Sequence, residues 1–114
     1  MESILASIKK MLGIVSEYQA FDPELIMYIN GAFMTLHQLA IGPEKPFKIT
    51  GSSETWDQFV GPELEAVKTY VFMKVKLIFD PPENSSVQQS YQEQIKELEW
   101  RMNTIAEIEE GAEG

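Results

Sequence analysis

The sequence predicts an all-α fold: a small four-helix bundle with one long irregular loop. Three observations predict it. Apolar residues recur at helical steps over 63–80, a regular apolar stripe follows in the last third of the chain, and a helix start signal stands at 21–24. We expect a short N-terminal helix, two long core helices and a long C-terminal helix within a single domain.

The first two helices are predicted from their ends as well as from their apolar residues. Residues 2–12 have an apolar face, with two lysines near the end of the segment. The second helix, 22–40, starts at Asp22, which we expect to cap it, and at Pro23, which suits the first helical position. Gly31 lies in its middle, where glycine costs roughly 1 kcal/mol relative to alanine, so we expect another backbone to approach closely there.

Residues 42–62 form the irregular part of the chain. Segment 47–50 alternates between apolar and polar residues, which suits a short strand or hairpin, and 53–59 suits one helical turn. A loop of about 20 residues is unusual in a small domain and is often functional. Its large apolar side chains need burial in the core or against a partner, and for Trp56 the core is the favoured alternative. The candidate interface residues of this loop are Phe47, Ile49, Trp56 and Phe59.

The last two helices have the strongest periodicity. The third, 63–80, is apolar nearly all round, which is typical of a helix buried by neighbours on more than one side. It stops at Pro81 and Pro82, and the fourth helix runs from about Asn84 to about Glu109. The apolar stripe of this fourth helix consists of Val87, Tyr91, Ile95, Leu98, Met102 and Ile105.

We expect one helical domain, residues 1–108, followed by a flexible acidic tail, residues 109–114. Trp100 lies off the stripe of the fourth helix, and tryptophan is enriched at binding hot spots. A position at the edge of the core is the equal alternative for this side chain. Trp100 is therefore a candidate interface residue, together with Glu109 and Glu110 of the tail.

The charge of the chain argues against several classes of partner. Its net charge is −9, from 18 acidic and 9 basic residues. Binding to nucleic acid depends on Lys and Arg displacing counterions, so we expect weak repulsion from nucleic acid and from anionic membranes. The sequence contains no cysteine, no segment typical of a signal peptide and no run approaching ~18 apolar residues, so we expect neither disulfides nor a membrane location. We expect synthesis in the cytoplasm.

The sequence offers no recognisable catalytic, cofactor or metal site. His37 is the only histidine, and no ligand stands at a metal-binding spacing from it. Phosphate-binding glycine loops and a nucleophile elbow are missing, and the carboxylates form no evident acid–base pair. We therefore predict no enzyme and no cofactor. Met27 and Met34, seven residues apart, suit the edge of the core or an adaptable contact face.

The order of elements and several segments carry a resemblance that covers nearly the whole chain. The segments are 18–22 (YQAFD), 26–30 (IMYIN), 36–39 (LHQL), 67–71 (VKTYV), 77–82 (LIFDPP) and 95–101 (IKELEWR). The sequence resembles the small head–tail connector (adaptor or head-completion) proteins of tailed phages and prophages. No single segment is diagnostic, and 67–82 is the most characteristic part.

The resemblance implies a helical bundle that assembles as a ring of about a dozen copies in the neck of the virion. Such a ring docks below the portal protein, extends the DNA channel and joins the tail or a stopper or other neck protein. DNA then passes through without sequence-specific binding, which an acidic conduit favours because like charges repel. The resemblance also implies that the acidic tail folds on docking to the portal. No catalytic residue is carried over.

Two other functions compete with the connector. One is a small cytoplasmic helical module for protein–protein interaction, a regulator or chaperone that holds a partner through Trp56 and Trp100. The other is a DNA-binding regulator, which the acidity of the chain and its lack of a basic recognition helix disfavour.

Overall fold

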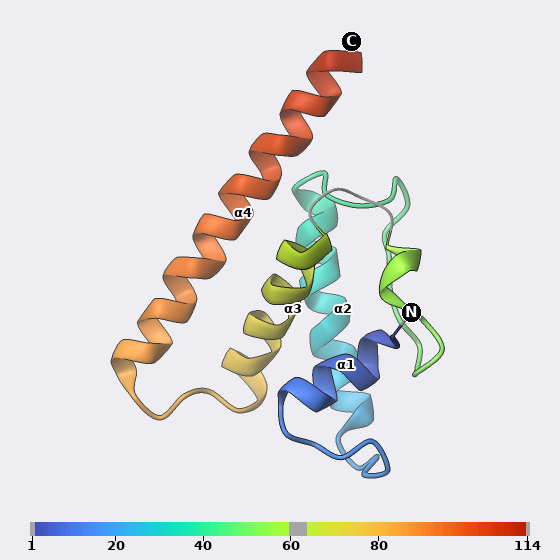
Figure 1. Cartoon of the computed structure of the whole chain (residues 1–114), viewed down its shortest axis with the longest axis vertical. Coiled ribbons are helices and arrows are strands. Elements are labelled where there is room, and N and C mark those ends of the chain that lie inside the picture. Colours follow the sequence, from blue (N-terminus) through green and yellow to red (C-terminus); the bar gives the residue numbers. More distant parts are fainter. Residues whose placement is uncertain (1, 60–63, 114) are drawn as a thin grey trace.

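The structure, a computed structural model, describes residues 2–59 and 64–113, and the surroundings of side chains as far as Ala106. These residues form four α-helices: α1 (Ile4–Met11), α2 (Asp22–Gln38), α3 (Leu64–Phe79) and α4 (Ser85–Glu113). A short 3-10 helix, η1 (Trp56–Gln58), lies between α2 and α3 (Figure 1). The described residues contain no strand, which confirms the prediction of a small all-α bundle.

Helix α3 is the central element, as its composition predicts. It packs against α2 on one side and against α4 on the other, while α1 packs against α2 (Figure 1). Val67, Val71 and Val75 are completely buried in these contacts. The molecule is flat, with extents of 47 × 35 × 19 Å, because α2, α3 and α4 lie beside one another and do not form a square bundle.

Helix α1 begins and ends where its terminal residues favour it. The hydroxyl of Ser3 accepts a hydrogen bond from the Ala6 amide at 3.3 Å, so Ser3 caps the helix. Gly13 follows the helix with φ +80°, a conformation that glycine adopts without strain. The amide of Ile4 donates to the carbonyl of Glu54 at 3.0 Å, which ties the start of the chain to the long loop.

Two predictions about α2 are wrong. Asp22 does not cap the helix: the N-cap position is Phe21, which makes no side-chain hydrogen bond, and the Asp22 carboxylate lies against the Lys9 ammonium instead. An ion pair with a buried lysine outweighs one capping bond. At Gly31 no backbone approaches, because an added Cβ would meet nothing within 4 Å. This glycine lies on the exposed side of α2.

Segment 47–50 is not a strand. The side-chain amide of Asn30 on α2 binds both backbone groups of Ile49: its Nδ2 donates to the Ile49 carbonyl at 2.9 Å, and its Oδ1 accepts from the Ile49 amide at 2.8 Å. These are the groups that a neighbouring strand would have satisfied. The predicted turn in 53–59 is present as η1, where the Gln58 side chain accepts a bond from the Thr55 amide at 3.1 Å.

A carboxylate fixes the turn just before η1. Glu54 accepts hydrogen bonds from the Thr50 amide at 3.0 Å, the Thr50 hydroxyl at 2.8 Å and the Gly51 amide at 3.4 Å. Burial alone would raise the pKa of Glu54, but these bonds favour its charged form and hold the pKa below its usual value. The long loop is therefore an ordered structure with its own polar contacts.

Polar contacts join α4 to the other helices. Asn84 caps it by accepting from the amides of Ser86 at 2.8 Å and Val87 at 3.3 Å. The buried Tyr70 hydroxyl on α3 donates to Glu99 at 2.6 Å. Burial raises the pKa of Tyr70, and the bond to Glu99 raises it further.

The end of α4 lies beyond its predicted limit. The helix continues to Glu113, past the expected end near Glu109, and its last turns extend past the other helices (Figure 1). Alanine and glutamate dominate 106–113 and are good helix formers, and one glycine costs only about 1 kcal/mol.

Candidate protein interface

The apolar residues predicted as interface in the long loop belong to the core of the chain. Trp56 is 0% exposed, Ile49 1% and Phe59 3%, and Phe47 is half-buried. The rings of Phe47, Trp56 and Phe59 surround Phe33 of α2, with centroid distances of 5.0 Å from Phe33 to Phe47 and 5.1 Å from Phe33 to Phe59. In this conformation Ile49, Trp56 and Phe59 are not available to a partner, so the core is the alternative that the structure favours.

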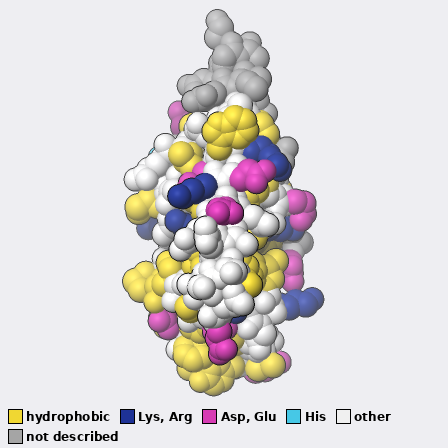
Figure 2. Space-filling model, turned by 90° about the vertical axis from the view of Figure 1, so that its left-hand side faces the viewer, with side chains coloured by type: hydrophobic (Ala, Val, Ile, Leu, Met, Phe, Trp, Pro, Cys, Tyr) yellow, Lys and Arg dark blue, Asp and Glu magenta, His cyan; other side chains and the backbone are white. Residues whose placement is uncertain are grey.

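Trp100 has the opposite environment. Its side chain is 70% exposed on α4, whereas Ile95 and Met102 of the same helix are 7% and 2% exposed and face the core. Figure 2 views the molecule from the side of α4, where hydrophobic side chains lie at the surface among acidic and basic ones. A large exposed indole is the kind of side chain that anchors a protein interface.

Glu109 and Glu110 are placed by their backbone alone. Both belong to α4, but their side chains lie outside the residues whose surroundings are described. Their role as interface residues stays a prediction.

Two further groups of exposed apolar residues lie near α2. Met27 and Met34 are each 62% exposed on the outer side of α2, which favours a contact face over the edge of the core. Val15 and Tyr18, in the connection between α1 and α2, are 66% and 48% exposed. Helical periodicity gives no sign of this second pair, because residues 14–21 lie between the two predicted helices. The only signal for this surface in the sequence is the presence of two large apolar residues, Val15 and Tyr18, in a short connection between helices.

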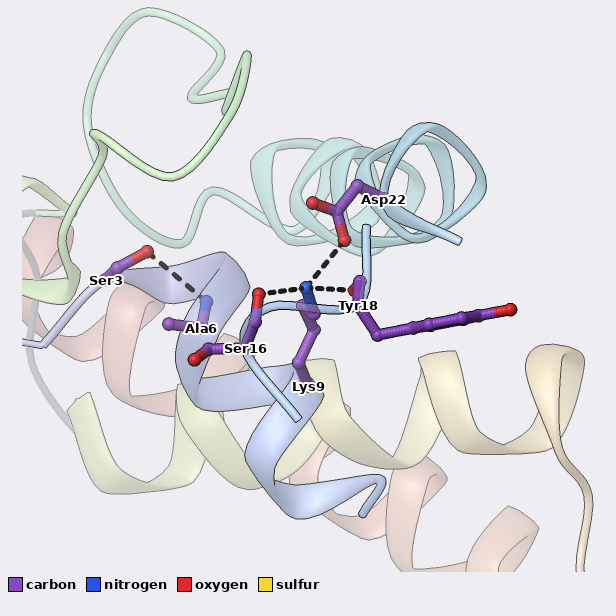
Figure 3. Close-up of polar contacts among 6 residues, drawn as sticks. All are labelled: Ser3, Ala6, Lys9, Ser16, Tyr18 and Asp22. Carbon is purple, nitrogen blue, oxygen red and sulfur yellow. Dashed lines mark hydrogen bonds and ion pairs between the residues drawn. The ribbon is translucent and has the colours of Figure 1, made fainter. Parts of the chain in front are cut away.

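A buried lysine orders the connection between α1 and α2 (Figure 3). The side chain of Lys9 is 4% exposed. Its ammonium donates to the carbonyls of Ser16 at 3.1 Å and Tyr18 at 2.6 Å, and it lies 2.9 Å from Oδ1 of Asp22. Two hydrogen bonds to carbonyls and one ion pair thus surround the ammonium, which is the condition for burying such a charge.

Aromatic packing continues from this connection to α3. The ring centroids of Tyr18 and Phe21 are 5.4 Å apart, and those of Phe21 and Phe79 are 5.0 Å apart. The exposed Tyr18 is therefore held by its backbone and by its ring, and the connection offers a fixed surface to a partner.

The described residues contain no group of three metal-ligating side chains close enough to hold an ion, and His37 is half-buried on α2. No described helix is long and apolar enough to cross a membrane. What the geometry offers is a set of exposed apolar anchors on an ordered helical scaffold, which suits contact with other proteins.

Comparison with known proteins completes this assignment. Neither the search of curated proteins nor the search of solved structures gave a match. A family model described as phage connector protein matches residues 4–109, which include all four helices almost to the end of α4. By this match the chain belongs to the phage connector protein family, a family of structural proteins.

Proposed function

We propose that the chain is a ring-forming subunit of the neck, between the head and the tail of a phage particle. The ring docks below the portal protein, extends the DNA channel and receives the tail or the next neck protein. It is composed of about a dozen copies of the chain, which has no catalytic role and binds no cofactor. The observation that carries this proposal is the match of residues 4–109 to the connector family.

Three features of the molecule support the proposal. Its flat shape, 19 Å in the shortest direction, suits a subunit that stands between two neighbours. Its exposed apolar side chains on α2 and α4 are available for contact with neighbouring proteins. Its net charge of −9 suits a channel wall along which DNA slides, because the wall offers little counterion-release attraction.

Within this proposal, residues 1–108 form the connector domain and 109–114 an acidic end beyond it. Trp100, Glu109 and Glu110 contact the neighbouring proteins. Trp100 lies on the open side of α4, so a partner reaches it without any rearrangement of the core.

The test is electron microscopy of the chain co-expressed with the phage's portal protein. We expect a ring attached to the portal. Trp100→Ser weakens the attachment or the ring without lowering stability, since the side chain is 70% exposed. Gln94→Ser, at an exposed polar position of the same helix, is the matched control. A monomer without affinity for portal, or a small complex of fixed stoichiometry with an unrelated protein, contradicts the proposal and favours an interaction module.

A further inference from the structure

An open groove separates the facing sides of α3 and α4. Its volume is about 310 Å³, and its apolar lining comes from Leu77, Ile78 and Ile95. Ile78 is 56% exposed there, a large fraction for a residue on the central helix. An apolar lining this open is not a completed core contact.

Two lysines line the same groove, Lys74 from α3 and Lys96 from α4. Neither forms an ion pair with any described residue, whereas the other cations of α3 and α4 do: Lys68 with Glu65, Lys76 with Asp80 and Arg101 with Glu97. The carboxylate of Glu99, also in the groove, is occupied by the Tyr70 hydroxyl. The groove therefore combines an apolar floor with two cations that have no anionic partner in this part of the chain.

The end of α4 has the complementary composition. Among residues 107–113 there are four glutamates and one isoleucine, Ile108, which follows Glu107 and precedes Glu109. An apolar side chain flanked by carboxylates suits a groove with an apolar floor and lysines at its sides.

The end of α4 cannot reach the α3–α4 groove of its own chain. Ile108 lies twelve residues beyond Lys96 on one continuous helix, which is about 18 Å along the axis. The end of α4 also points away from the body of the molecule (Figure 1). The complementary segment must come from another copy.

We propose that the acidic end of α4, residues 107–113, of one copy binds in the α3–α4 groove of the next copy in the ring. This inference rests on the proposed ring function. Ile108 lies against Ile78 and Ile95, and the glutamates pair with Lys74 and Lys96. Two different surfaces meet in this contact, and a contact of that kind builds a ring when the rotation between copies closes, whereas a two-fold contact stops at a dimer. The pairing also offsets the repulsion between subunits that each carry −9.

Cross-linking tests the contact directly, because the chain has no cysteine of its own. Ile108→Cys combined with Ile78→Cys, assembled on the portal and mildly oxidised, gives a ladder of disulfide-linked multimers on a denaturing gel. Ile108→Cys combined with Met27→Cys is the control, since Met27 is similarly exposed, at 62%, but lies on α2. Rings that form with no ladder, or with the same ladder in the control, overturn this inference and leave the ring function standing.

Charge reversal gives a second measurement. Lys96→Glu raises the protein concentration needed for ring assembly roughly fivefold, and adding Glu109→Lys and Glu110→Lys restores assembly in part. Lys48→Glu, at an exposed loop position outside the groove, is the matched control and leaves assembly unchanged. Equal effects at Lys96 and Lys48, or no rescue, count against the contact. If no ring forms with the unaltered chain, the proposed function fails first and this inference fails with it.

Discussion

Replacing Lys9 with methionine tests whether the buried ammonium determines the stability of the α1–α2 connection. Methionine keeps most of the aliphatic volume, so packing changes little. The substitution leaves the Asp22 carboxylate without its counter-ion and the carbonyls of Ser16 and Tyr18 without their donor. The perturbation is therefore mainly the loss of one positive charge.

The magnitude follows from the exposure of the groups left behind. Removing one partner of a buried ion pair costs about 3–5 kcal/mol. The Asp22 side chain is 22% exposed and Ser16 and Tyr18 lie at the surface, so water compensates in part and the lower limit applies. We expect a loss of about 3 kcal/mol in the free energy of unfolding, which for a chain of this length lowers Tm by roughly 12 °C.

Urea denaturation followed by tryptophan fluorescence measures this loss. Trp56 is completely buried and Trp100 is 70% exposed, so most of the spectral change on unfolding reports on Trp56 in the core. Lys10→Met is the control: its side chain is exposed and forms no ion pair among the described residues, so we expect a change within about 0.5 kcal/mol.

A double-mutant cycle separates the ion pair from the loss of the lysine alone. Lys9→Met and Asp22→Asn together should cost at least about 1 kcal/mol less than the sum of the two single changes, because they remove the same interaction. A loss below about 1 kcal/mol for Lys9→Met, or strict additivity with Asp22→Asn, would refute the reasoning.

Three further substitutions have definite expected outcomes. Gly31→Ala stabilises the chain by up to about 1 kcal/mol, because an added Cβ meets nothing within 4 Å. Gly42→Ala destabilises the chain by roughly 2–4 kcal/mol, because φ is +97° and the added Cβ would overlap the Phe59 ring. Urea titrations that rank these two alike would contradict both assignments. Tyr70→Phe removes the bond to Glu99 and costs about 1–2 kcal/mol at pH 7. The raised pKa of Tyr70 means that its stabilising contribution is complete below about pH 10, the ordinary pKa, and is lost as pH rises above it, so denaturation curves of wild type and Tyr70→Phe should converge at alkaline pH.

The helices could be predicted because their signals are local. The apolar periodicity of α3, the cap at Asn84 and the break at Pro81 and Pro82 each depend on residues a few positions apart. Asp22 shows the limit of such signals. It has the right type and position for a cap, but Lys9, thirteen residues earlier, binds it instead, and nothing local reveals that competitor.

The same limit explains the long loop. Segment 47–50 has the alternation of a strand, and a strand needs a partner with free backbone groups. The partner is the side chain of Asn30, which sits on a helix and has no pattern that marks it for this contact. The alternation therefore marks Ile49 as a residue that needs cover, in the core or against a partner, but it misassigns the backbone; the structure places Ile49 in the core.

The two tryptophans show what decides an interface and what does not. Residue type is the same, yet Trp56 is buried and Trp100 exposed. The period of a helix places Trp100 out of phase with Ile95 and Met102, which left the edge of the core and an interface as equal alternatives, and the exposure of its side chain favours the interface. Periodicity says nothing about Trp56, because a loop has no period. The burial of Trp56 depends on Phe33 of α2, which contributes to the same aromatic cluster. On a helix, the periodicity shows which residues lie off the core-facing side. Trp100 is such a residue and is exposed, so it remains the strongest candidate contact with a neighbouring protein.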